Sequence, residues 1–380
     1  MTSIDDTPAW RGVDTRCLAR EVWGIYIGLV IDTQEKLQVF VPMLRDATWI
    51  ALDTEADSLH AYPEKVCLIQ ISTAAGDRLV DSLAGINLGP LLEALSGHEL
   101  IMHGADYDVR LLLKHQSFVP SSIFDTMLAA RFLGEREFGL GALVLKHLGV
   151  KLEKGPQKAN WAMRPLTGRM EQYARNDTHY LKPLEEKLKP ELESKGRLAW
   201  HAEACARLIQ ESTQPRVVDM EMIWRIKGSH LLGRLALAVL RELWHWRESE
   251  AVHSNRPPYF VLSHEAMVRI AAEASVEHPV KPFLPRHFSE RRRAGLNQAI
   301  AKGMAVAAGD HPRFPVQTNH RPADAERRRF EQLQKKRDAR AAALGLDPTL
   351  IASRGTLADL ARDWDKHAAE LMTWQRDLLA

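Results

Sequence analysis

The first 200 residues alternate between short apolar runs and longer stretches with helical spacing. Runs such as WIALDT (49–54) and KVCLIQIST (65–73) are short, apolar and bounded by turn residues, which predicts strands. In DYDVRLLLKHQ (106–116) apolar residues recur every three or four positions, which predicts an amphipathic helix. Further strands are expected at 28–33, 77–83 and 99–104, and further helices at 34–47, 89–97, 124–134, 139–149 and 167–196. Strands joined by tight turns and followed by helices predict an α/β domain with a mixed sheet.

The remainder of the chain has only helical patterns. RLALAVLRELWHWRESEAVH (234–253) carries an apolar stripe at helical spacing. Ser263 is expected to cap a helix over 264–274, and Asp347 followed by Pro348 is typical of a helix start. These patterns predict a first domain over 1–212 with an extension of about 25 residues at its N-terminus, a helical domain over 218–308, a linker over 309–322 and a second helical domain over 323–380.

The strand at 49–54 leads into an unusual series of acids. Asp53, Glu55 and Asp57 occupy alternate positions, and alternate side chains of a strand point to the same face. Three carboxylates on one face repel one another unless a Lys or Arg, water or a metal lies between them. By itself, this series favours an exposed and solvated strand end.

Two other stretches supply acids of the same kind. Asp108 lies at the start of the predicted helix 106–116, where the helix dipole alone would favour an acid. Tyr173 and Asp177 are four residues apart and therefore share a helix face. Their alternative roles are ordinary ones: Tyr173 as a packing residue, and Asp177 as the partner of a neighbouring Arg or His.

Composition and charge narrow the class of protein. Hydrophobic residues make up 45% and charged residues 26% of the 380 residues, which is ordinary for a globular protein. No apolar run reaches the length of a membrane span, the N-terminus lacks a signal-peptide pattern, and the three cysteines are widely spaced, so we expect a cytoplasmic protein. Residues 201–380 hold 28 Lys and Arg against 22 Asp and Glu, whereas residues 1–200 hold 23 against 27. An acidic half joined to a basic half is expected of a polyanion-binding protein with a cation-dependent site.

Four segments together resemble a known family. LDTEADSLHAYPEKVCLIQIS, MHGADYDVRLL, WAMRPLT and YARNDTHYL look like the exonuclease motifs of the ribonuclease D family, in the DEDD branch whose third motif carries a tyrosine. The resemblance covers roughly residues 28–190. The block around RIKGSHLLGRLALAVLRELWHWRESEA resembles the HRDC module (helicase and RNase D C-terminal), and the last sixty or so residues look like a divergent second copy.

This resemblance implies a fold, a mechanism and a set of residues. The fold would be an α/β, ribonuclease H-like 3′–5′ exonuclease domain with a mixed sheet, followed by two small all-helical HRDC-like domains. Asp53 would bridge two divalent cations, Mg²⁺ or Mn²⁺, while Glu55 and Asp177 complete the metal site that activates water. Asp108 would hold the second cation, and Tyr173 would position the attacking water. Two such cations can stabilise both the attacking and the leaving oxygen of a phosphodiester, and Mg²⁺ prefers oxygen ligands.

Other residues near the motifs are assigned less directly. Thr54, His103, Gln157 and Arg164 are candidates for substrate binding, although His103 fits a structural histidine as well. Asp125 is expected to be an N-cap and Trp161 a core residue. Asp57 and Asp106 have no role in the family pattern and are interpreted as surface acids or as supports behind the ligands.

The leading function is therefore a metal-dependent 3′–5′ exoribonuclease that releases nucleoside 5′-monophosphates, with tRNA precursors and other small stable RNAs as partners. Neither a membrane nor an obligate protein partner is expected. A 3′–5′ DNA exonuclease and a catalytically idle RNA-binding adaptor are the alternatives. Basic residues of the helical domains would contact phosphates; they are Arg291–Arg293, Arg327–Arg329, Lys335, Lys336 and Arg337.

Overall fold

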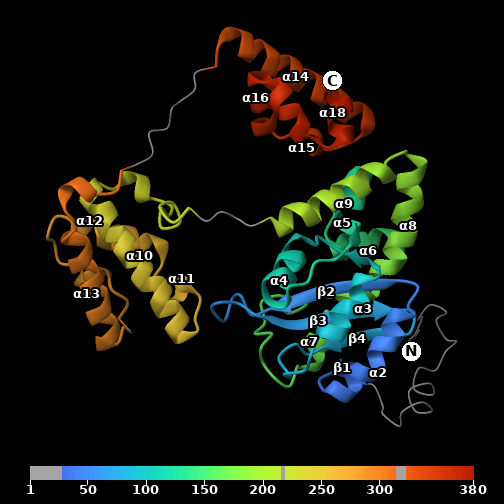
Figure 1. Cartoon of the computed structure of the whole chain (residues 1–380), viewed down its shortest axis with the longest axis horizontal. Coiled ribbons are helices and arrows are strands. Elements are labelled where there is room, and N and C mark those ends of the chain that lie inside the picture. Colours follow the sequence, from blue (N-terminus) through green and yellow to red (C-terminus); the bar gives the residue numbers. More distant parts are fainter. Residues whose placement is uncertain (1–27, 215–218, 287, 314–321) are drawn as a thin grey trace, which may run out of the picture. The chain divides into compact units, whose positions relative to one another are not determined.

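A mixed β-sheet organises the first half of the chain. The structure is a computed structural model that describes residues 28–214, 219–286, 288–313 and 322–380 (Figure 1). The predicted N-terminal extension and residues 314–321 of the predicted linker lie outside these ranges. The described residues divide into two compact units: residues 28–56, 66–214 and 322–380 form one, and residues 57–65 and 219–313 form the other.

The sheet has six strands within the described residues, in the order β1-β4-β3-β2-β5-β6. β2 is antiparallel to β3, and β3 to β4, whereas β2 is parallel to β5. The strands are β1 (Val30–Ile31), β2 (Ile50–Ala56), β3 (Val66–Thr73), β4 (Gly76–Val80), β5 (Glu99–Met102) and β6 (Ser122–Asp125). The mixed α/β sheet expected from the sequence is thus present.

One strand differs from its prediction. Phe124 and Asp125 were expected to begin a helix, but they end β6, which pairs in parallel with β5 at the edge of the sheet. Asp125 then caps the helix that follows, because its carboxylate accepts hydrogen bonds from the backbone N–H groups of Met127 and Leu128. The N-cap role predicted for Asp125 is confirmed, and the prediction that Phe124 is helical is wrong because an apolar residue completes the sheet edge there.

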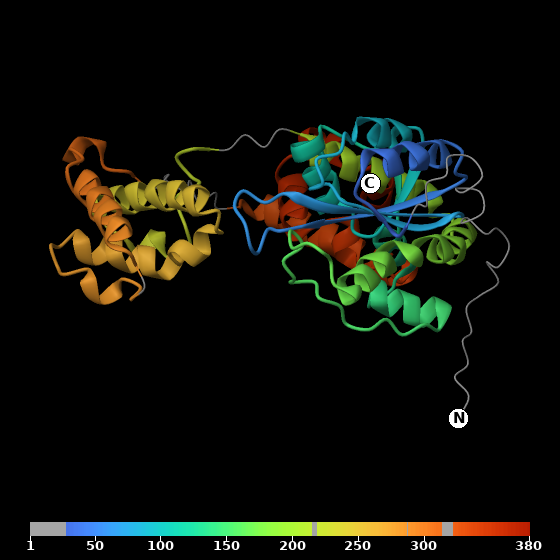
Figure 2. The same ribbon diagram turned by 90° about the horizontal axis from the view of Figure 1, so that it is seen from below.

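Helices cover both faces of the sheet. In Figure 2 the blue and teal helices α2 and α3 lie on one side of the sheet and the green helices α6 and α7 on the other. The helices of this part of the chain are α2 (Gln34–Arg45), α3 (Gly89–Ser96), α4 (Asp106–Gln116), α5 (Thr126–Leu133), α6 (Leu140–Leu148), α7 (Gly168–His179), α8 (Leu181–Ser194) and α9 (Leu198–Thr213).

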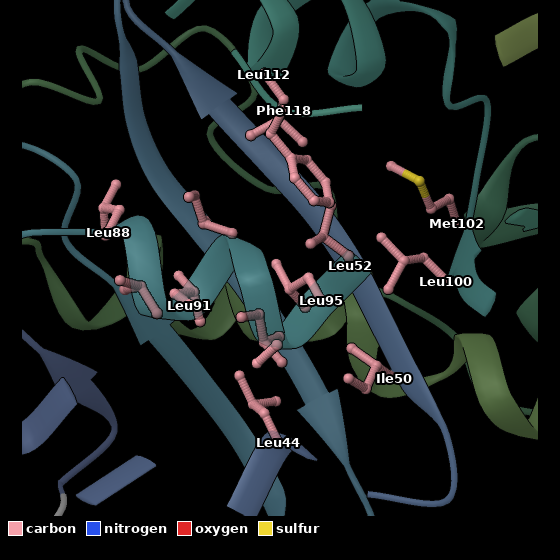
Figure 3. Close-up of a cluster of buried hydrophobic side chains, with 14 of the residues drawn as sticks. Leu44, Ile50, Leu52, Leu88, Leu91, Leu95, Leu100, Met102, Leu112 and Phe118 are labelled. Atoms are coloured by element: carbon pink, nitrogen blue, oxygen red, sulfur yellow. The ribbon is translucent and has the colours of Figure 1, made fainter. Parts of the chain in front are cut away.

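The core on the α3 side is apolar throughout. Figure 3 shows Leu91 and Leu95 of α3 against Ile50 and Leu52 of β2. All four side chains are fully buried. At roughly 1.5–3 kcal/mol for each large apolar side chain removed from water, this layer anchors the strand that carries the first acid motif.

The helix predicted over 167–196 is two helices that break at Tyr180. The two halves pack into different cores. Ala174 of α7 lies in a cluster with residues of β3, whereas Leu184 and Leu188 of α8 lie in a cluster with α5. The break therefore lets α7 stay on the sheet while α8 turns to cover α5.

The second unit contains the first helical domain. Its helices are α10 (Arg234–Ser254), α11 (Pro258–Val261), α12 (His264–Ala274) and α13 (Glu290–Met304). Leu240, Met267 and Leu296 are buried in its core, and Trp246 packs against that core. Ser263 caps α12 through a hydrogen bond accepted from the backbone N–H of Ala266 (3.2 Å), as predicted. None of the helices in the described ranges is both long and apolar enough to cross a membrane.

The C-terminal helical block shares a core with the first part of the chain. Its helices are α14 (Asp324–Leu344), α15 (Pro348–Ile351), α16 (Arg354–Arg362), α17 (Trp364–His367) and α18 (Thr373–Leu379). Trp374 stacks on Trp200 of α9 with ring centroids 5.1 Å apart and meets Phe132 of α5 edge-on at 5.3 Å. Arg197 donates hydrogen bonds to the backbone oxygens of Phe132 and Leu344, each at 2.6 Å. The block thus covers an apolar surface of α5 and α9.

Trp374 is 3% exposed at this junction. Trp374→Ala is therefore expected to lower the free energy of unfolding of the first unit by about 3–5 kcal/mol, the range typical of Trp-to-Ala changes in a core. Thermal unfolding followed by circular dichroism measures the shift. The control is Leu231→Ala, because Leu231 is 78% exposed and its truncation removes little packing. Equal unfolding midpoints for the two variants would contradict a shared core.

Candidate active site

β2 presents two acids side by side on one face of the sheet. Asp53 is opposite Gln70 and Glu55 is opposite Leu68 in the antiparallel register with β3. The register shifts after Glu55, and β2 ends at Ala56. Asp57 is therefore not the third acid of this face: it is 1% exposed and accepts a hydrogen bond from the backbone N–H of Lys65 (2.7 Å). The expectation that three acids share one face is wrong for Asp57 because of this bulge.

Helix α7 brings a third carboxylate to the same place. One ligand oxygen from each of Asp53, Glu55 and Asp177 lies within 4.8 Å of the other two. Neither neighbouring cation neutralises Asp177, since His179 contacts Asp77 at 2.9 Å and Arg175 lies 3.9 Å from the same Asp77. The alternative in which Asp177 pairs with one of these residues is therefore wrong.

Asp108 approaches from the other side of β2. Thr54 alternates with Asp53 and Glu55, so it points to the opposite face, and its hydroxyl donates a hydrogen bond to Asp108. Both residues are 6% exposed. Thr54 therefore orients a carboxylate, and its hydroxyl is committed within the protein. Asp125 also supports this corner, because it accepts hydrogen bonds from the backbone N–H groups of Gly104 and Ala105 just before α4.

Burial raises the pKa values of all four carboxylates, and the charges of the other acids add to this shift at Asp53, Glu55 and Asp177. Burial, followed by the charges of Asp108, Asp177 and Glu55, raises the pKa of Asp53 well above its ordinary value. Burial and then Asp177 raise the pKa of Glu55 to about 9. Burial raises the pKa of Asp177 to about 7, although a hydrogen bond with Tyr173 opposes the shift. Burial raises the pKa of Asp108 to about 6 against the opposing hydrogen bond from Thr54. Such a cluster stays ionised near neutral pH only if cations join it.

A cavity of about 310 Å³ opens over the three clustered acids. His103, Gln157 and Tyr173 line it together with Gly139 and Leu140 at the start of α6. The sequence drew no attention to Gly139 and Leu140, because a glycine before a helix is a common helix start and carries no chemical signal.

His103 is held in one tautomer. The Thr126 hydroxyl donates to the backbone oxygen of Met102 (3.0 Å), so its oxygen accepts from His103 Nδ1 at 2.9 Å. Burial lowers the pKa of His103. The imidazole is therefore neutral, and Nε2 carries a lone pair that can accept a hydrogen bond.

Arg164 has a structural position. Its guanidinium makes two hydrogen bonds to Asp81, at 2.5 and 2.6 Å, and one to the backbone oxygen of Trp161 at 2.7 Å. Trp161 is 1% exposed, as predicted for a core residue. Arg164 thus fixes the segment that precedes α7, and its charge is already satisfied.

The segment before α7 also packs on Tyr173. A Cβ atom at residue 155 would overlap the Tyr173 ring, so only glycine fits there. Burial raises the pKa of Tyr173, and a hydrogen bond with Gln157 opposes this shift. Gly155 and Gln157 together set where the phenol lies, and the raised pKa keeps it protonated.

Gly155→Ala is expected to displace the Tyr173 ring and to lower kcat by about 10²-fold, the loss typical of a displacement of about 1 Å at a reacting centre. Steady-state rates on a 3′-hydroxyl RNA oligonucleotide measure this, and a Mn²⁺ titration is expected to show unchanged affinity, because the three acids keep their places. Gly168→Ala is the matched control, since a Cβ there meets nothing within 4 Å. An equal kcat for the two variants would contradict the positioning role of Gly155.

The donor set fits hard divalent cations. It consists of the carboxylate oxygens of Asp53, Glu55 and Asp177, with no sulfur, and Mg²⁺ or Mn²⁺ favours such ligands. No Lys or Arg of the described residues forms an ion pair with these three acids, so their mutual repulsion is what a bound cation would relieve. The residues present therefore fit a divalent metal centre.

Comparisons with family models and known sequences agree with this chemistry. Residues 29–193 match the model described as 3′-5′ exonuclease, and residues 236–277 match the HRDC domain. The ribonuclease D of Gluconacetobacter diazotrophicus is 31% identical over 75% of this chain and 74% of its own length. The ribonuclease D of Granulibacter bethesdensis is 29% identical over 92% of this chain and 90% of its own length.

Solved structures show the same architecture. Escherichia coli RNase D, described as an exoribonuclease involved in structured RNA processing, aligns with a TM-score of 0.69 and 25% identity over 90% of this chain and 91% of that one. The catalytic core of RRP6 from Trypanosoma brucei aligns with a TM-score of 0.60 and 27% identity over 72% and 79% of the two chains. A protein from Bifidobacterium adolescentis, at 22% identity and a TM-score of 0.80 over 93% and 95%, shares the fold.

Proposed function

Because this chain belongs to the ribonuclease D family, we propose that its acid cluster is a two-cation site for trimming the 3′ ends of tRNA precursors. The chain is a 3′–5′ exoribonuclease. The observation that supports the cation site is the convergence of Asp53, Glu55 and Asp177 within 4.8 Å.

The ligands have different roles in this proposal. Asp53, Glu55 and Asp177 would hold one Mg²⁺ or Mn²⁺ ion, and Asp53 together with Asp108 would hold a second. Bound cations supply Lewis acidity at the scissile phosphate and lower the pKa of the attacking water. Thr54 holds the Asp108 carboxylate by its hydrogen bond, so we assign Thr54 to positioning this ligand.

Tyr173 orients the water that attacks the phosphate. Its hydrogen bond with Asp177, one helical turn away, fixes the phenol beside the first ion site. Since its pKa is raised by burial, the phenol is protonated at neutral pH and acts as a hydrogen-bonding group, while proton acceptance falls to the carboxylates.

The RNA 3′ end enters the cavity lined by His103 and Gln157. The neutral His103 can accept a hydrogen bond from a ribose hydroxyl through Nε2, and a 2′-hydroxyl is the group that distinguishes RNA from DNA. Gln157 forms a hydrogen bond with the Tyr173 phenol and so holds this phenol beside the terminal nucleotide. Arg164, which is paired with Asp81, supports the wall of the cavity.

The helical domains, proposed to span 218–308 and 323–380, hold long RNA near the cavity through phosphate contacts. Several candidate residues have partners within the protein. Arg291 and Arg292 bond to Glu250 at 2.5 and 2.7 Å, and Arg329 donates to the backbone oxygen of Ala361 (2.7 Å). These three side chains are therefore less available for phosphate contacts. Low sequence specificity is expected, because phosphate contacts carry no sequence information.

A paired digestion tests this function. With Mg²⁺ or Mn²⁺ the protein is expected to shorten a 3′-hydroxyl RNA, including a tRNA precursor with a 3′ trailer, to nucleoside 5′-monophosphates, and EDTA is expected to stop the reaction. A DNA strand of matched sequence is expected to be cut at least about tenfold more slowly, because it lacks the 2′-hydroxyl. Equal rates on RNA and DNA would favour the DNA exonuclease alternative, and RNA binding without any cutting would favour the adaptor.

A further inference from the structure

A buried amide lies next to the central acid of the site. Gln70 of β3 is 0% exposed, and neither its Nε2 nor its Oε1 has a hydrogen-bond partner in the described structure. Burial of an unpaired amide costs free energy, on the order of the hydrogen bonds it forgoes in water. Most buried polar groups in proteins are paired, so an unpaired amide of this kind needs a reason.

The position of Gln70 supplies a reason for the unpaired amide. The register pairs Gln70 directly with Asp53, and directly opposed residues have Cβ atoms about 4.5–5.5 Å apart on the same face of the sheet. A glutamine side chain is long enough to reach a carboxylate across that distance.

The neighbours of Gln70 on its own strand confirm the face. Leu68, two residues before, packs in the cluster that contains Ala174 of α7. Ser72, two residues after, donates to Asp77 (2.6 Å), and its hydroxyl oxygen lies 2.8 Å from the Thr178 hydroxyl of α7. Gln70 therefore lies between β2 and α7, the two elements that carry Asp53 and Asp177.

We propose that Gln70 is a positioning residue for the cation site: when cations bind, its Nε2–H, which has no partner in the described structure, donates to the Asp53 carboxylate and fixes that ligand. Carboxylates that ligate metals are commonly held by hydrogen bonds from residues behind them, and loss of such a support typically weakens metal affinity about 10–100-fold. This inference rests on the proposed function of Asp53.

The test uses full-length protein and measures Mn²⁺ affinity by calorimetry, with thermal unfolding in EDTA as a second readout. Gln70→Met and Gln70→Leu keep an apolar side chain of similar volume and remove the amide. Both variants are expected to unfold at the same or a higher temperature than the parent in EDTA, because an unpaired buried amide is gone. Both are expected to bind Mn²⁺ about 10–100-fold more weakly.

Ser72→Ala is the matched control on the same strand and face. It removes a hydroxyl that has two partners, so it is expected to lower the unfolding temperature and to leave Mn²⁺ affinity unchanged. A purely structural Gln70 would behave like Ser72, with lower stability and parental affinity, and that result would overturn the proposal.

Asp53→Asn separates this inference from the proposed function. If Asp53→Asn loses Mn²⁺ binding while both Gln70 variants keep parental affinity, the positioning role of Gln70 fails and the cation site stands. If Asp53→Asn binds Mn²⁺ as the parent does, the cation site itself fails.

Discussion

Asp53→Asn is expected to abolish RNA hydrolysis, with a loss of at least about 10³-fold, well above the roughly 10–100-fold typical when only a support behind a ligand is lost. Asparagine keeps the size of the side chain but removes the negative charge that, in the proposed site, would bind both cations. The rate of 5′-monophosphate release from a 3′-hydroxyl RNA at saturating Mg²⁺ measures this loss.

The same variant is expected to be more stable than the parent in EDTA. In the parent, burial and the charges of Asp108, Asp177 and Glu55 all oppose ionisation of Asp53, so removing this carboxylate relieves repulsion. Asp106→Asn is the control, because Asp106 lies near Asp108 but pairs with Arg110 outside the cluster. Activity of Asp53→Asn within tenfold of that control would contradict the bridging role.

Metal affinity is expected to rise steeply with pH. The folded-state pKa values of Asp177 and Glu55 are raised to about 7 and about 9, and their unfolded values are near 4. Protonation therefore favours the folded, metal-free protein. That stability is fully present below about pH 4 and is lost as the pH rises through 7 and 9.

Cations reverse this trend because they bind the deprotonated carboxylates and displace the protons. Each proton displaced increases Mg²⁺ affinity by about tenfold for each pH unit. Thermal unfolding at several pH values between 5.5 and 8.5, with EDTA or with Mg²⁺, measures both effects. As the pH rises, the unfolding temperature is expected to fall in EDTA, and to fall less steeply or to rise in Mg²⁺. If Mg²⁺ changes the unfolding temperature by the same amount at every pH, these carboxylates do not bind the cation.

Much of this architecture follows from local patterns in the chain. The helix predicted over 106–116 is found at those bounds as α4, because its apolar spacing and its surroundings agree. Asp347 caps α15 as expected, since its carboxylate accepts from the backbone N–H of Thr349 (2.8 Å). The two adjacent acids of β2 were evident because a strand places alternate residues on one face.

Other features depend on partners far away in the sequence. The pairing of Arg164 with Asp81 and of Thr54 with Asp108 cannot be inferred from either residue alone. The same holds for Gly155, whose lack of a side chain matters only because the Tyr173 ring occupies that space. For Asp57 the local spacing was misleading: it predicts the same strand face as Asp53 and Glu55, but the bulge after Glu55 turns Asp57 away from that face.

The C-terminal block was expected to be a separate domain, because a predicted linker precedes it and it has a helical pattern of its own. The structure places Trp374 in a core with Phe132. The sequence pattern could not reveal this contact, because an amphipathic pattern shows that a helix has an apolar face but does not show which partner covers that face.

Anomalous diffraction from crystals soaked in Mn²⁺ tests the central claim most directly. We expect an anomalous peak bounded by the carboxylates of Asp53, Glu55 and Asp177, and a second ion on the Asp108 side of Asp53 when a nucleotide is bound. A map in which these three carboxylates contact no ion at saturating Mn²⁺, in crystals whose protein cuts RNA in solution, would contradict the account.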